Sequence, residues 1–297
     1  MTYSIVARDA ATGQLGVAVQ SHWFSVGSVV TWAEPGVGAV ATQSFAEPAY
    51  GPRGLALMRL GVDATTALHA LVTSDAQEAR RQVAFVDAQG AVAVHTGGAC
   101  IAEAGHVTGE AVSAQANMMR SGDVWPAMLE AYGGARGDLS ERLMAALDAG
   151  EAAGGDVRGS QSAAMLIVSG TSSSQPWQER LLDLRVEDSA DPLGELRRLL
   201  TVHRGYGHME RAEEREIDGD TAESLREYQA ARPLLQGNDE ATFWAAVMLS
   251  DSGRDDDARA LLREVVGRHD GWAELLRRLP RAGLLRGGDA AVARLLG

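Results

Sequence analysis

The sequence feature that most restricts the fold is a β-hairpin pattern that begins at the second residue. Residues 2–7 predict a strand, residues 9–13 predict a turn, and residues 15–20 predict a second strand. Chain ends are normally frayed unless a contact or a function holds them in place. A strand at the very start of the chain therefore needs a reason to be there.

One such reason is catalysis by the N-terminal residue itself. Met1 precedes Thr2, whose side chain is small enough for methionine aminopeptidase to remove Met1. A freed Thr2 would carry a hydroxyl nucleophile together with an α-amine base, whose unperturbed pKa of about 7.7–8.0 allows it to accept the hydroxyl proton near neutral pH. The alternative is that Met1 is retained and Thr2 is an ordinary strand residue.

Composition excludes several classes of function. A net charge of −13 argues against a non-specific binder of nucleic acid or of anionic membranes. The chain contains no lysine, so all 27 of its basic residues are arginines. Cys100 is the single cysteine, which rules out a disulfide within the chain. We see neither a leader pattern nor an apolar run of about 18 residues, and we expect a cytoplasmic protein.

The first two thirds of the chain alternate between strand and helix patterns. A helix is also expected after Asp63, which is placed to cap it. Further strands are predicted over 36–43, 82–86, 91–95, 112–117, 162–169 and 181–186, and further helices over 54–60, 125–132 and 139–151. This order predicts an α+β domain over residues 1–190 in which sheets pack between layers of helices.

From residue 192 onward the pattern is helical only. Helices are predicted over 193–202, 221–235, 240–250, 256–266 and 272–279. The turns at 218–220 and 252–254 lie about 34 residues apart, which is the period of tetratricopeptide-type helical hairpins. We therefore predict a connecting helix or linker over 191–210 and a small all-α helical-repeat domain over 211–297.

An ordered set of short motifs resembles the N-terminal-nucleophile (Ntn) hydrolases and, more closely, the DUF1028 family. The matching stretches are 2–6, 16–21, 26–30, 38–44, 50–54, 95–97, 104–106 and 154–162. This resemblance implies a four-layer αββα sandwich with Thr2 as the nucleophile. For the C-terminal part of such chains it also implies a helical module that is sometimes named peptidoglycan-binding.

The resemblance also implies how the amine of Thr2 would be assisted. In proteasome-like relatives an acidic residue at the end of the second strand and a nearby lysine lower the pKa of the amine. This chain has Gln20 at that strand end and no lysine. We expect Gln20, with Ser21 and arginine side chains, to orient the amine by hydrogen bonds; otherwise the activity is weak or lost.

The turn over residues 154–160 corresponds to a segment from which an Asp and a Ser reach the N-terminal amine in the resembling enzymes. We therefore expect Asp156 and Ser160 to lie near Thr2. Arg158 would supply positive charge in place of lysine, or bind a substrate carboxylate in a bidentate fork. Alternatively, Asp156 accepts hydrogen bonds from local backbone N–H groups, and Arg158 forms a surface salt bridge.

Other polar residues near strand ends are candidates for substrate contact. Thr42 and Gln43 are assigned to the oxyanion or the substrate. Asn117 would donate an amide hydrogen to a developing oxyanion, an interaction that contributes about 2.7–4 kcal/mol when well placed. Ordinary sheet polarity, or a turn at a strand end, explains the same residues without a function.

A second catalytic scheme would pair Cys100 with His95 or His106. A lone cysteine is more often a small core residue, however. The same residues fall short of a zinc set of three or four well-spaced ligands. We expect neither a metal nor a cofactor.

We thus predict an enzyme that hydrolyses an amide bond in a small molecule or short peptide. The alternative is a non-catalytic binding or scaffold protein on the same fold. Trp23, Phe24, Trp32 and Tyr50 are expected to wall a pocket or to form a subunit contact. We expect a homo-oligomer, a dimer, with no nucleic-acid or membrane partner.

Overall fold

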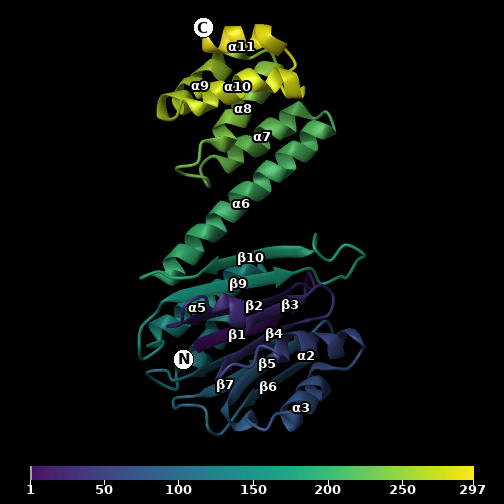
Figure 1. Ribbon diagram of the computed structural model, residues 1–297, viewed down its shortest axis with the longest axis vertical. Helices are drawn as coiled ribbons and strands as arrows, with labels where there is room; N and C mark the ends of the chain where they lie inside the picture. Colours follow the sequence, from purple (N-terminus) through teal and green to yellow (C-terminus); the bar gives the residue numbers. More distant parts are fainter. Residues whose placement is uncertain (1) are drawn as a thin grey trace. The chain divides into compact units, whose positions relative to one another are not determined.

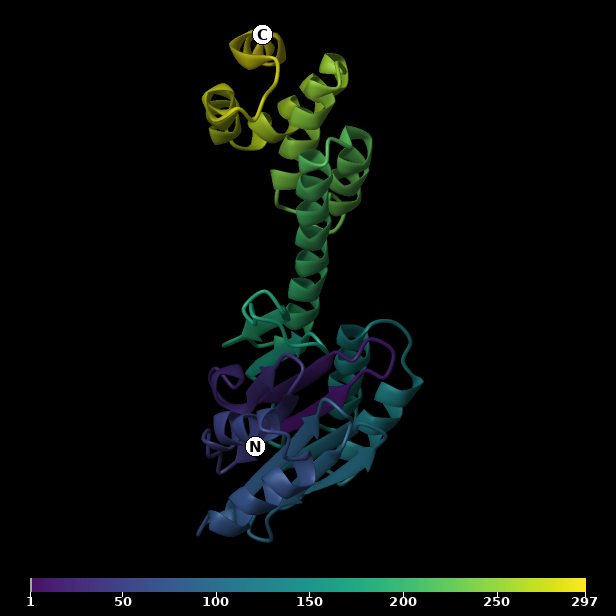
Figure 2. The same cartoon turned by 90° about the vertical axis from the view of Figure 1, so that its right-hand side faces the viewer.

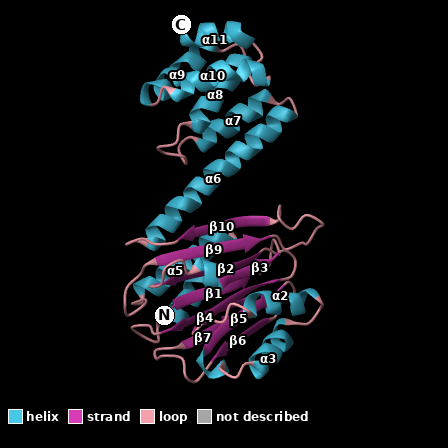
Figure 3. Ribbon diagram, in the orientation of Figure 1, coloured by secondary structure: helices cyan, strands magenta, loops and turns pink. Residues whose placement is uncertain are grey.

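The computed structural model describes residues 2–297 (Figure 1). Two compact units make up the chain, the first ending at Arg198 and the second running Leu199–Gly297. The first unit contains two antiparallel sheets with helices, and the second is helical (Figure 3). The predicted mixed class, sheets and helices followed by an all-helical region, is confirmed.

A six-stranded antiparallel sheet holds the start of the chain in its interior. Its strand order is β10-β9-β2-β1-β8-β7. These strands are β1 (Thr2–Arg8), β2 (Leu15–Ser21), β7 (Gly105–Gly109), β8 (Val112–Asn117), β9 (Ser162–Val168) and β10 (Arg180–Val186). Thr2 lies opposite Ser21 on one side and opposite Asn117 on the other. The first described residue is therefore fixed by pairing on both flanks instead of fraying.

A four-stranded sheet faces the first one. Its order is β3-β4-β5-β6, with bounds β3 (Thr31–Glu34), β4 (Gly38–Ser44), β5 (Arg81–Asp87) and β6 (Val92–Thr96). An apolar cluster joins the two sheets and includes Val6 and Val17 from one sheet and Ala41 and Ala84 from the other. Because side chains alternate between the faces of a strand, the neighbouring positions of these strands face away from this interface.

Helices cover the two remaining sheet faces. The helices of this unit are α1 (Gly27–Val30), α2 (Tyr50–Arg59), α3 (Ala64–Ser74), the 3₁₀ helix η1 (Glu78–Arg80), α4 (Val124–Gly134) and α5 (Leu139–Ala152). Helices α2 and α3 pack on the smaller sheet, and α4 and α5 pack on the larger one. As predicted, Asp63 caps α3, accepting hydrogen bonds from the N–H groups of Thr65 and Thr66.

The second unit has its own core. It contains α7 (Thr221–Ala231), α8 (Glu240–Asp251), α9 (Asp255–Arg268), α10 (Gly271–Ala282) and α11 (Gly288–Leu296), drawn in light green to yellow in Figure 2. Helix α6 (Pro192–Ile217) begins before Leu199. Helix α8 packs against both α7 and α9. In the core Phe243 contacts Trp244 and Trp272 at ring-centroid distances of 5.3 and 5.0 Å. Among residues 2–297 no helix combines the length and apolar character needed to cross a membrane.

The contact between α2 and β5 depends on a glycine. A Cβ atom added at Gly54 would lie 2.4 Å from the ring of Phe85, so we expect Gly54→Ala to destabilise the first unit by about 1–3 kcal/mol through overpacking. Gly133 in α4 has no atom within 4 Å of such a Cβ. Gly133→Ala should therefore be neutral or stabilise by up to about 1 kcal/mol. Urea unfolding of both variants measures the difference, and equal effects would contradict this packing.

Candidate functional site

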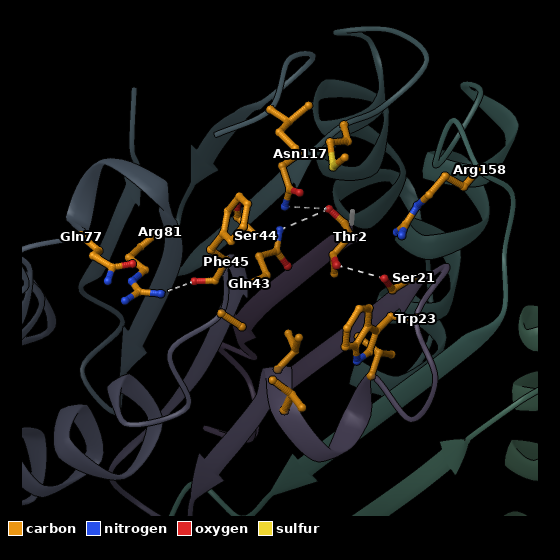
Figure 4. Close-up of a pocket in the computed structure, with 16 residues that line it drawn as sticks. Thr2, Ser21, Trp23, Gln43, Ser44, Phe45, Gln77, Arg81, Asn117 and Arg158 are labelled. Carbon is orange, nitrogen blue, oxygen red and sulfur yellow. Dashed lines mark hydrogen bonds between the residues drawn. The ribbon is translucent and has the colours of Figure 1, made fainter. Parts of the chain in front are cut away.

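A cavity of about 500 Å³ opens at the Thr2 end of the two sheets (Figure 4). This volume is within the range of about 300–1,000 Å³ that is typical of small-molecule sites. Its polar wall is formed by Thr2, Ser21, Gln43, Ser44, Gln77, Arg81, Asn117 and Arg158. Its apolar wall is formed by Trp23, Val26, Val29, Val30, Phe45, Ala46, Ile101 and Met118. Strand ends from both sheets thus meet around one space.

Thr2 lies on this wall with its hydroxyl bonded to a second hydroxyl. Its Oγ1 is 3.0 Å from the Oγ of Ser21, and both residues are buried. The two side chains meet because directly opposed residues of an antiparallel pair point to the same face. By the same register Ser162 of β9 lies beyond Ser21. Its hydroxyl donates to the carbonyl of Trp23 and accepts from Val26 N–H, which ties the loop after β2 to the sheet.

Gln82 fixes the orientation of the amide groups behind Thr2. Its Nε2 donates to the carbonyls of Gly105 and Ala116 at 3.1 and 2.9 Å. Since a carbonyl cannot donate, the NH₂ of Gln82 must face these two groups. Its Oε1 must then face the other way, where it accepts from Nε2 of Gln43 at 2.7 Å and from Nδ2 of Asn117 at 3.0 Å.

The same logic orients the next two amides. Gln43 uses its NH₂ toward Gln82 and the Thr2 carbonyl, and its Oε1 accepts from Ser4 Oγ at 2.6 Å. Asn117 directs its NH₂ to Gln82 and, at 3.4 Å, to the Thr2 carbonyl. Its Oδ1 is then a buried acceptor with no partner within residues 2–297. The predicted oxyanion donor thus has its N–H groups committed elsewhere, and the group left over is an acceptor.

Two residues of the wall have strained backbones. Ser44 and Met118, with φ values of 70° and 59°, follow directly after Gln43 and Asn117. Non-glycine residues rarely occupy this left-handed region, and such outliers gather at functional sites. Both residues line the cavity, Ser44 as the last residue of β4 and Met118 directly after β8.

Arg158 lines the cavity and is held in place by Asp156. Asp156, whose side chain is fully buried, accepts from the N–H groups of His22 and Arg158 at 3.3 and 2.9 Å. It also forms an ion pair with the Arg158 guanidinium, at 3.1 Å from Nη2 to Oδ2. Asp156 itself is not part of the cavity wall. The aspartate therefore acts on the cavity through Arg158, and the predicted local backbone bonds of Asp156 are present as well.

Three predicted site residues lie elsewhere. Gln20 pairs with Tyr3 across the two strands, so both side chains lie on the same face of the sheet. The Tyr3 hydroxyl donates to Glu151 of α5, which shows that this face is the helix-covered one and not the face that carries Thr2. Thr42 points to the opposite face of β4 from Gln43 and donates to the carbonyl of Glu47. Ser160 does not line the cavity. The roles assigned to these three residues do not match this geometry.

The cysteine and histidine residues do not form a nucleophile pair. Cys100 Sγ donates to the Arg81 carbonyl at 3.3 Å, His95 contacts Glu78, and His106 Nδ1 lies 2.9 Å from Thr96 Oγ1. Burial, and secondarily the neighbouring His95, lowers the pKa of His106. Within residues 2–297 no group of three or more histidine, cysteine, aspartate and glutamate residues is placed to hold a metal ion.

Of the four aromatic residues expected around a pocket, only Trp23 lines this cavity. Trp32 and Tyr50 pack on the outer side of the smaller sheet. Phe45, in the loop after β4, supplies the other aromatic wall. Among the residues missed from the sequence are Arg81, Gln82, Ser4 and Ser162. For the last three the one signal is a polar side chain at an inward position of a buried strand.

The amide network gives a direct test. Gln82→Leu removes one acceptor and two donors from a fully buried position. Unsatisfied buried groups cost about 1–3 kcal/mol each, so we expect a loss of at least ~2 kcal/mol in the free energy of unfolding. Gln89→Leu, at an exposed turn position, is the matched control and should change it by less than ~0.5 kcal/mol. Urea unfolding of both variants would contradict the network if the two losses were equal.

Comparison with known proteins agrees with the motif set. The profile of the family of unknown function DUF1028 matches residues 2–196, which include every strand and the whole cavity wall described above. The crystal structure of protein SPO2555 from Silicibacter pomeroyi, of the same family, is similar with a TM-score of 0.60 and 31% sequence identity, covering 67% of this chain and 87% of that chain. No curated protein matches the chain. With its sheets, its cavity and its Thr2 inside the matched region, the chain belongs to the DUF1028 family.

Proposed function

We propose that the first unit is an N-terminal-nucleophile amide hydrolase in which Thr2, freed of Met1, is the catalytic residue. The observation that carries this proposal is the position of the Thr2 hydroxyl on the cavity wall, bonded to Ser21 and held by strand pairing on both sides. Such rigid placement is what a nucleophile requires. The order of helices, two facing sheets and helices supports an Ntn-type αββα sandwich.

In the proposed reaction the neutral α-amine of Thr2 takes the proton of Oγ1 while Oγ1 attacks the amide carbonyl carbon. The protonated amine gives this proton to the leaving nitrogen, the C–N bond breaks, and an acyl ester of Thr2 remains. Water, deprotonated by the same amine, then attacks the ester, and the proton returns to Oγ1 as the acid leaves. One amide bond and one water molecule thus yield a carboxylic acid and an amine.

The amide network has a role in this scheme. Gln43 and Asn117 both donate to the Thr2 carbonyl, which holds the backbone of the nucleophile still. The Oδ1 of Asn117 has no partner among residues 2–297, and Asn117 pairs directly with Thr2 across the two strands. We assign this oxygen as an acceptor for the α-ammonium group. Ser21 keeps the hydroxyl of Thr2 oriented.

A binding protein without turnover is the second candidate. It is favoured by the lack of any carboxylate or lysine in the cavity wall formed by the described residues. Without such groups, the charged side chains among the described wall residues are those of Arg81 and Arg158, and Arg158 is the more exposed of the two. The two candidates differ in whether residue 2 is free and whether its hydroxyl is consumed in a reaction.

The first test concerns the N-terminus. Because the sequence contains no lysine, the α-amine is its single primary amine, and an amine-directed reagent reports on that group alone. We expect protein produced with a C-terminal, lysine-free tag to carry the label on Thr2, as read by mass spectrometry of the N-terminal peptide. A label on Met1 in all molecules would contradict the nucleophile.

The second test concerns the hydroxyl. Ala and Ser, like Thr, are small enough to permit Met1 removal, so the variants keep a free residue 2. Against an amide library, Thr2→Ala should lose about 10³-fold or more in kcat/KM, as expected when a covalent nucleophile is removed, whereas Thr2→Ser retains part of the activity. Equal rates for the wild type and Thr2→Ala would favour the binding protein.

The pH dependence follows from the cavity wall. Its described residues include no Asp, Glu, His, Cys or Tyr, so the α-amine is the group that titrates near neutral pH. The amine must be neutral to accept a proton, and we expect kcat/KM to rise with pH through one pKa and then stay level. A bell-shaped profile would show that a second titrating group takes part.

A further inference from the structure

We propose that the substrate of this cavity is an N-acyl amino acid, with an apolar acyl chain on one side of the scissile amide and a free carboxylate on the other. This inference rests on the proposed function for the position of the amide bond. The charged residues of the wall indicate where the carboxylate of the substrate binds, and the apolar residues indicate where its acyl chain binds.

The charge of the cavity wall has one sign. Among the described residues that line it, the charged side chains are Arg81 and Arg158, although acidic residues outnumber arginines by 40 to 27 in the sequence. Arg81 is bonded to Asp75 and to the Phe45 carbonyl, and its side chain is only 10% exposed. Arg158 is the more accessible cation, since its side chain is 33% exposed.

The ion pair between Arg158 and Asp156 has its positive end toward the cavity. Its partner Asp156 has a fully buried side chain outside the cavity wall, while Arg158 belongs to the wall and its guanidinium points toward Thr2 (Figure 4). The pair therefore presents its positive end to the cavity and keeps its negative end behind. A guanidinium has five N–H donors in a planar fork and suits a carboxylate better than any neutral group.

Valines at helix α1 and two aromatic residues form the apolar part of the cavity wall. Val29 and Val30 of α1, and Val26 directly before this helix, line the cavity. Gly27 lets α1 lie close to β9, since a Cβ at Gly27 would be 2.5 Å from the Cβ of Ala164. Trp23 and Phe45 belong to the same wall and are 60% and 49% exposed. Apolar side chains that stay this exposed beside a cavity are suited to cover an apolar ligand group.

The arrangement around Thr2 sets the direction of the substrate. Figure 4 shows Arg158 and Phe45 on opposite sides of Thr2. With the scissile carbonyl at Thr2 Oγ1, a carboxylate on the leaving amino acid reaches Arg158 while the acyl chain extends toward Phe45 and the valines of α1. The amine product is then an amino acid, and the ester intermediate carries the apolar chain.

Ligand binding tests this assignment without turnover. We would measure N-octanoylglycine, N-octanoylglycinamide and N-acetylglycine by titration calorimetry on Thr2→Ala, in which the ligand is not consumed. A charge-assisted hydrogen bond raises binding affinity roughly 10- to 100-fold. N-octanoylglycine should therefore bind at least ~10-fold more tightly than its uncharged amide. It should also bind at least ~10-fold more tightly than N-acetylglycine, which lacks the apolar chain.

Arg158→Gln on the same background should remove the preference for the carboxylate and leave the affinity for the amide unchanged. Arg180→Gln is the matched control, because Arg180 is an exposed arginine of β10 paired with Asp183 outside the cavity. Arg158→Lys keeps the charge beside Asp156 and should keep part of the preference if Arg158→Gln fails to fold.

Equal binding of the acid and the amide, or no binding of either, would overturn the substrate class, whether or not another amide is hydrolysed. Tight and selective binding of N-octanoylglycine without hydrolysis by the wild type would support the ligand class and count against the proposed reaction. The two hypotheses are therefore separable in one set of measurements.

Discussion

The arrangement of the cavity depends on the pairing of β1 with a neighbour on each side. A chain end in the middle of a sheet has its backbone groups directed by β2 and β8, so residue 2 occupies a defined position that an edge strand or a loop would not give. The register then decides which side chains join Thr2. Ser21, Asn117 and, one strand further, Ser162 share its face because opposed residues of antiparallel strands point the same way.

This register explains which sequence predictions succeeded and which did not. The two hairpins, the strand before Asn117 and the cap at Asp63 were all predicted, because alternation, turn residues and capping residues are local signals. The face of each strand is not local. A shift of one residue moves a side chain to the other side of a sheet, and Gln20 and Thr42, each one position from a cavity residue, lie on the wrong side for that reason. Strand β3 and helix α1 carried too few residues to form a pattern.

The network around Gln82 is the part of the site that sequence reasoning could not reach. Its order comes from two backbone carbonyls, of Gly105 and Ala116, which belong to different strands and become neighbours of Gln82 only when the sheets face each other. These carbonyls fix the amide of Gln82, whose Oε1 in turn accepts from the amides of Gln43 and Asn117. Both of these amides also donate to the Thr2 carbonyl. The one sign of this in the sequence is a glutamine at an inward strand position, and ordinary sheet polarity explains such a residue equally well.

The distribution of strain and polarity along the inter-sheet space supports a functional use of its Thr2 end. At the other end Val6, Val17 and Leu166 pack with alanines of β4 and β5 in an apolar cluster that stabilises the contact between the sheets. At the Thr2 end the same strands place amides and hydroxyls instead, leave Asn117 Oδ1 without a partner among the described residues, and continue into left-handed Ser44 and Met118. Each of these features disfavours folding. A sheet pair selected for stability alone would extend the apolar cluster along its whole length, so the concentration of such features around one threonine supports a functional site at that position.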